Sequence, residues 1–165
     1  MLKHNREAFT PYVPRGLESL LATRSRYKTS QRISNILEGV SEDFVVLADA
    51  RQTIDSLTPS LMEVDMNGEG YQKLMLGSYV LEQLLKNCPT YMPDDNEIAE
   101  LGRLAVKCLN CKDSGVRMRA SSFCVPFHAR VGDQRFWHSI DGVEDGSKSL
   151  LTYYIEKGAR ESPPA

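Results

Sequence analysis

Apolar residues recur along the chain at the spacing expected of a helix that buries one face. The clearest stripe runs from Val116 to Val131 in steps of three or four residues, and it includes Ala120, Phe123 and Phe127. Because 3.6 residues make one helical turn, these side chains fall on one side of a helix and must pack against neighbouring elements. The stripe therefore predicts a helix that is covered along one face.

The same periodicity recurs in segments of about 15 residues, separated by short breaks rich in Gly, Pro, Asn, Asp or Ser. The clearest break is Asn67-Gly-Glu-Gly70, and the segment after it is apolar nearly all round, which predicts a helix sandwiched inside the fold. The predicted helices cover, in chain order, Val13 to Leu21, Ile33 to Phe44 with Ile36 and Val40 in its stripe, Ala50 to Val64, Tyr71 to Asn87, Ile98 to Cys108, a helix that begins at Asp113 or Ser114, Gln134 to Ile140, and Ser147 to Lys157.

Strand signals are weak, because Phe44-Val-Val-Leu47 is the only candidate run and it lies inside a helical pattern. We therefore predict an all-α fold. Paired helices that repeat at about 40 residues indicate a HEAT-repeat-like (TOG-like) helical solenoid of about three to four helix pairs, each burying its face by stacking on the next. An irregular helical bundle would give the same periodicity and stays open. We expect one domain over residues 1–161 and a frayed tail at 162–165.

Composition favours a soluble, intracellular protein. The chain has 165 residues, of which 41% are hydrophobic, and a domain of this size buries roughly two-thirds of its unfolded surface. Its apolar runs are too short to span a membrane, and its start does not have the pattern of a signal peptide. The four cysteines are expected to be reduced thiols, since a domain this large needs no disulfide scaffold.

Charge is segregated along the chain although the net charge is only −2. Residues 1–35 hold seven Lys/Arg against two Asp/Glu, residues 36–101 hold three against thirteen, and residues 102–165 hold ten against seven. A nucleic-acid-binding domain usually has a basic pI and a continuous basic face, and an acidic middle argues against both. We therefore expect protein partners and no nucleic acid.

Catalytic and metal-binding motifs are lacking. Cys108-Leu-Asn-Cys111 has the spacing of half a zinc site, but no second pair of ligands lies at a matching distance. The glycines at 68 and 70 are not followed by the Lys-Ser/Thr of a phosphate-binding loop, and no Ser or Cys lies in a recognisable nucleophile turn. We predict no catalytic residue, no metal site and no cofactor.

Two features are candidates for partner binding. Arg24, Arg26, Lys28 and Arg32 form the densest basic patch, which could dock an acidic partner or simply be a solvated face. Trp137, the single tryptophan, could anchor an interface or pack between the last helices. These five residues are the predicted partner-binding residues.

One pair of segments resembles a known family. The helix Val116-Arg-Met-Arg-Ala-Ser-Ser-Phe-Cys-Val-Pro-Phe-His-Ala-Arg-Val-Gly-Asp133, followed by Leu150-Leu-Thr-Tyr-Tyr-Ile-Glu-Lys157, is similar to the C-terminal HEAT domain of the CLASP family of microtubule-stabilising proteins. The order and spacing of the motifs agree, and the likeness covers residues 45–160. Met118-Arg119, the interruption of the helix by Pro126, and Phe136-Trp137 depart from the family pattern and indicate a divergent, fungal member.

The resemblance implies a non-enzymatic protein-interaction domain. Such a domain recruits its parent protein to kinetochores, the spindle or microtubule plus ends, in cytoplasm and nucleus, by binding adaptor proteins, and self-association into a homodimer stays open. The alternative is a TOG-like module that binds tubulin directly. The family's TOG domains present a Trp in their first inter-helix loop, whereas Trp137 lies near the end of this chain. The acidic middle would also repel the acidic surface of tubulin.

Overall fold

The structure, a computed structural model, describes residues 8, 10–26 and 31–161, and all regular elements in these residues are helical. The all-α prediction is therefore confirmed for the described part of the chain. The elements are η2 (Thr10–Tyr12), α2 (Val13–Arg26), α3 (Gln31–Leu47), α4 (Ala50–Met62), α5 (Gly68–Asn87), α6 (Asp95–Leu109), α7 (Ser114–Val131), α8 (Asp133–Ser139) and α9 (Asp145–Glu161). The predicted tail at 162–165 lies outside the described residues.

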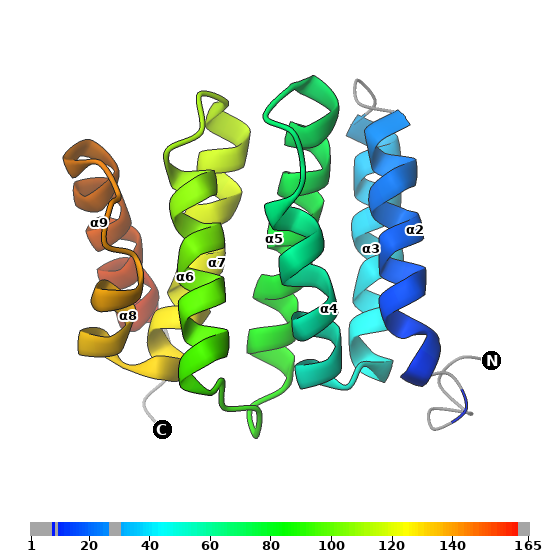
Figure 1. Ribbon diagram of the computed structural model, residues 1–165, viewed down its shortest axis with the longest axis horizontal. Helices are drawn as coiled ribbons and strands as arrows, with labels where there is room; N and C mark the ends of the chain where they lie inside the picture. The colour runs from blue at the N-terminus through cyan, green and yellow to red at the C-terminus, as the bar shows by residue number, and fades with distance from the viewer. Residues whose placement is uncertain (1–7, 9, 27–30, 162–165) are drawn as a thin grey trace.

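The helices form two layers (Figure 1). One layer holds α2, α4, α6 and α8, and the other holds α3, α5, α7 and α9, so that each pair of consecutive helices contributes one helix to each layer. Neighbouring pairs contact each other within both layers, as α4 with α6 and α5 with α7. The α4–α5 and α6–α7 connections lie along one edge, and the α5–α6 and α7–α8 connections lie along the opposite edge.

The core lies between these layers. The predicted stripe of α7 is buried throughout, from Val116 at 0% exposure to Val131 at 8%. Helix α5 packs against α2, α3, α4 and α7, which confirms that the helix with apolar residues nearly all round is sandwiched. Packing on several sides explains why Leu74, Leu76 and Leu81 are all buried although they do not share one face.

Local polar side chains set the helix starts. Asp113 accepts a hydrogen bond from the Val116 amide at 3.0 Å and caps α7, as its sequence position predicts. The α5 boundary differs, because the helix begins at Gly68 and not at Tyr71. Asn67 is its cap and accepts from the Gly70 amide at 2.9 Å. A Cβ at Gly70 would lie 1.6 Å from the Asp65 carbonyl oxygen, so glycine permits this close turn into the helix.

Two expectations need correction. Pro126 does not interrupt α7, which continues from Ser114 to Val131. Pro costs a helix one backbone hydrogen bond, and the buried residues on both sides of it hold the helix together. On α3, Ile36 is 55% exposed and Val40 is 38% exposed. That helix belongs to the terminal pair, so no further described pair covers its outer side.

Candidate interaction surfaces

The predicted basic patch is not a continuous exposed surface in the described residues. Arg24 is only 7% exposed, and burial lowers the pKa of its guanidinium while the charge of Glu38 on α3 raises it. Arg32 is exposed at the start of α3. The side chain of Arg26 and all of Lys28 lie outside the described residues. Arg24 therefore packs within the fold and is not part of an exposed basic surface, and a role of these residues in partner binding stays a prediction.

The difference in burial between Arg24 and Arg32 can be tested by thermal denaturation. Arg24→Ala should lower the stability by about 1–3 kcal/mol, because it empties space at a buried polar site. Arg32→Ala removes an exposed side chain and should change stability by no more than about 0.5 kcal/mol. Equal melting temperatures for the two variants would contradict the burial of Arg24.

Trp137 packs against the core at one side. Its indole ring meets the buried Phe136 ring edge-on, with 5.1 Å between centroids, and its Nε1 donates a hydrogen bond to Asp133 Oδ1 at 3.1 Å. Phe136 also contacts Phe127 edge-on at 5.4 Å, so the tryptophan extends an aromatic cluster that joins α7 to α8. Packing thus accounts for the ring's position, and a role for Trp137 as an interface anchor stays a prediction.

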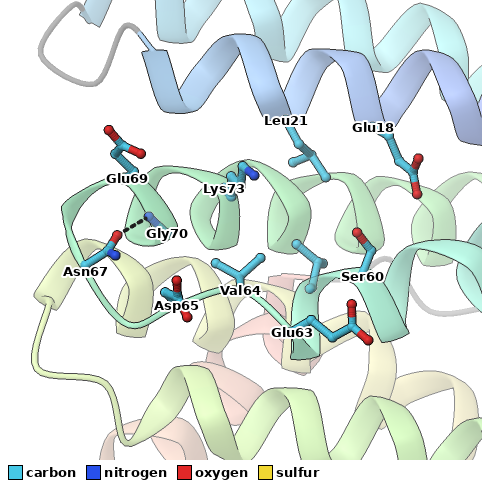
Figure 2. A pocket seen from close by; sticks show the side chains of 11 residues that line it. Glu18, Leu21, Ser60, Glu63, Val64, Asp65, Asn67, Glu69, Gly70 and Lys73 are labelled. Atoms are coloured by element: carbon cyan, nitrogen blue, oxygen red, sulfur yellow. Dashed lines mark hydrogen bonds between the residues drawn. The ribbon is translucent and has the colours of Figure 1, made fainter.

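An acidic hollow of about 440 Å³ lies where α2, α4 and α5 meet (Figure 2). Glu18 comes from α2, Glu63 and Asp65 follow α4, and Glu69 lies in the first turn of α5, while Lys73 is the one basic residue among the described residues of the lining. The hollow thus gathers four carboxylates from three segments, which would attract cations and repel acidic surfaces. Sequence reasoning noted an acidic middle but could not find this hollow, since only the packing of α2 brings Glu18 to it.

A polar cluster joins α4 to the start of α6. Arg51 forms an ion pair with the buried Glu97, lies 3.3 Å from Asp94 Oδ2, and donates to the Met92 carbonyl at 2.9 Å. Glu97 Oε2 also accepts from the Tyr91 hydroxyl at 3.0 Å, and Oε1 accepts from the Asp94 amide at 3.0 Å. The Asp94 side chain accepts in turn from the Glu97 amide, which completes a capping box. We name these five residues the α4–α6 latch.

Asp55 borders this latch and should make stability depend on pH. Partial burial, a hydrogen bond to Glu97 and the negative charge of Glu97 raise the pKa of Asp55 to about 6, from an ordinary 3.8. The folded chain therefore holds the proton more tightly than the unfolded chain. This preference stabilises the fold fully below about pH 4 and is lost as the pH rises through about 6.

Asp55→Asn should remove this dependence, because asparagine remains neutral while it occupies the same space. In urea titrations, the variant should gain stability relative to the wild type above pH 6, and the difference should shrink toward pH 4. The matched control is Asp43→Asn, which makes the same substitution at an exposed position of α3 away from Glu97. Parallel profiles for Asp55→Asn and wild type would contradict the raised pKa.

Comparison with known proteins decides the family. No profile of a known protein family matches the chain. The chain is 43% identical over 99% of its length to Protein STU1 of Gibberella zeae, 39% identical over 98% to Protein STU1 of Chaetomium globosum, and 37% identical over 98% to Protein stu-1 of Neurospora crassa. The chain is homologous to a segment of the fungal STU1 proteins, of the CLASP family. It spans 14–16% of the length of these three relatives.

The described residues of the chain do not form a metal site or a reactive thiol site. In them, no three His, Cys, Asp or Glu side chains are grouped so as to hold a metal ion. Cys108 and Cys111 are both buried and unbridged, and burial raises the pKa of the Cys108 thiol to about 12. A thiol with such a pKa stays protonated and unreactive near neutral pH. Among the same residues, every helix is too short or too polar to cross a bilayer.

Proposed function

We propose that this STU1 segment is a non-enzymatic, HEAT-repeat-like domain that binds adaptor proteins and thereby brings its parent protein to kinetochores, the spindle or microtubule plus ends. The observation that carries the proposal is the stacking of consecutive helix pairs in two layers (Figure 1). Stacked pairs of this kind leave long outer faces and connecting edges available for binding other proteins. The homology to STU1 proteins, together with the CLASP-like motifs of α7 and α9, supports the microtubule context.

Direct binding of tubulin by this domain is disfavoured by charge. Exposed carboxylates of the connections after α4 and α8 include Glu63, Asp65, Asp141 and Glu144. Because the tubulin surface is acidic as well, like charges would meet at a contact made by these connections. The proposal therefore assigns microtubule attachment to adaptors and not to the domain itself.

The experiment replaces the corresponding segment of a fungal STU1 protein. Deletion of the segment should abolish the localisation of the fluorescent parent protein at kinetochores and spindle, and insertion of this chain should restore it. In parallel, the isolated chain should elute separately from soluble tubulin in size-exclusion chromatography at low salt, where electrostatic attraction is strongest. Unchanged localisation after deletion would contradict the recruitment role. Co-elution with tubulin would instead favour the TOG-like alternative.

A further inference from the structure

A basic groove lies between two neighbouring helices of one layer, α6 and α8. It is a hollow of about 450 Å³ between α6 and α8, bordered by Arg103 of α6 and by Arg135 and His138 of α8. Ile98 and Ala99 contribute an apolar surface to the same hollow. The lining thus holds two guanidinium groups against one carboxylate, that of Asp95, and it is apolar along α6. This excess of basic groups occurs in a chain whose residues 36–101 are strongly acidic.

The polar side chains of this groove are available to a ligand. Arg103 and His138 are exposed, and within the described part of the chain neither side chain makes a hydrogen bond or an ion pair. Arg135 pairs with Asp95 at 3.0 Å, but its side chain is 56% exposed and that of Asp95 is 89% exposed. An ion pair so open to water contributes little, so a ligand carboxylate can replace Asp95 at low cost.

The surface continues from the groove toward α4. Arg103 also borders a second hollow of about 230 Å³, which Pro59 and Met62 of α4 line with apolar atoms. Met62 is 36% exposed. Arg103 thus lies between two hollows with apolar walls. A ligand that extends across α4, α6 and α8 would contact apolar surface on both sides of the Arg103 guanidinium.

We propose that this surface, made by Met62, Ile98, Arg103, Arg135 and His138, binds an acidic peptide segment of a protein partner. Carboxylates of the peptide pair with the two guanidinium groups, which suit bidentate contacts, and large apolar side chains lie in the two hollows. This inference rests on the proposed protein-binding function and names the chemistry of one partner. A nucleic-acid ligand fits less well, because a phosphate backbone binds through many basic contacts and does not use the apolar walls of the two hollows, whereas this surface has two guanidinium groups.

The experiment selects peptides from a random library displayed on phage against the immobilised chain. Peptides of about 12 residues are long enough, since an extended peptide rises about 3.3 Å per residue and neighbouring helices lie about 9 Å apart. We expect enrichment of sequences that combine Asp or Glu with large apolar residues. Enrichment of basic sequences, or of none, would overturn the proposal.

The best selected peptide, labelled with fluorescein, is then titrated against variants of the chain. Arg103→Glu and Arg135→Glu should each weaken its binding by about tenfold or more, and added salt should weaken binding to the wild type. Arg15→Glu makes the same charge change at an exposed arginine of α2 and should have little effect. Circular dichroism of each variant checks folding.

Equal affinity for the wild type and both groove variants would overturn the groove as the binding site. That outcome would leave the recruitment role standing, because the localisation and tubulin experiments do not depend on which surface binds. If deletion of the segment abolishes localisation of the parent protein while Arg103→Glu and Arg135→Glu bind the peptide as the wild type does, this inference fails and the proposed function stands.

Discussion

Replacing Phe123 with Ala should lower the free energy of unfolding by about 3–5 kcal/mol, because a buried aromatic ring leaves a cavity that the surroundings fill only in part. Phe123 is 1% exposed, and its ring stacks on Phe127 with 5.5 Å between centroids. Helix α7 packs against α5, α6, α8 and α9, so the cavity would open where several pairs meet. Because neighbouring helices surround this site, the remaining side chains can move only a little to fill the cavity.

Urea denaturation followed by circular dichroism measures this effect. The matched control is Met118→Ala on the same helix, since Met118 is 61% exposed and should lose no more than about 0.5 kcal/mol. The slopes of both unfolding curves should equal that of the wild type, which would show that the denatured state is unchanged. Similar losses for both variants would contradict the stripe that places Phe123 in the core.

The features that the sequence predicts well are those fixed by nearby residues. The stripe of α7 follows from steps of three and four residues, and its cap follows from Asp113 three residues before Val116. Both depend on local geometry that any helix shares, so no knowledge of the neighbouring helices is needed. The start of α6 is also set by nearby residues, because Asp94 and Glu97 form its capping box, although the apolar pattern alone places that start only near Ile98.

Exposure is harder to predict because it depends on which helices are neighbours. Ile36 lies in the apolar pattern of α3, yet it is exposed on the outer side of the terminal pair. Arg24 shows the opposite case, since it was assigned to a basic surface and is buried. Its position three residues after Leu21 and seven after Leu17 places it on the buried stripe of α2, and that spacing was the available signal.

The basic groove could not be found from the sequence. Arg103 and Arg135 are far apart in the chain, and only the stacking of α6 on α8 brings them to one hollow. That stacking is close, because a Cβ on Gly102 would lie 2.2 Å from the Ser139 carbonyl oxygen. The charge counts of the three segments also gave no sign of the groove, since Arg103 comes directly after residues 36–101, the most acidic segment. Its basic character arises from packing and not from a run of basic residues.

Replacing Glu97 with Ala should destabilise the fold by about 3 kcal/mol, because a buried carboxylate that serves several donors is removed at once. The side chain of Glu97 is 5% exposed, and the substitution leaves the Tyr91 hydroxyl without its acceptor. Arg51 loses its buried ion-pair partner and keeps only its contacts with Asp94 and the Met92 carbonyl. The capping box at the start of α6 is lost as well. Both consequences weaken the contact that the α4–α6 latch makes between two successive pairs.

A double-mutant cycle separates the latch from the cap. Arg51→Ala, Glu97→Ala and the double variant are compared by urea denaturation, and the coupling between the two side chains should be at least about 1 kcal/mol. Glu97→Gln should lose less than Glu97→Ala, since its amide oxygen can still accept from Tyr91 while the charge that pairs with Arg51 is gone. Glu100→Ala, one turn further along α6, is the control for removal of a glutamate from this helix. Additive losses in the cycle would mean that the ion pair between Arg51 and Glu97 contributes nothing to the stacking of the pairs, and that the effect of Glu97→Ala comes from the capping box and the Tyr91 hydrogen bond.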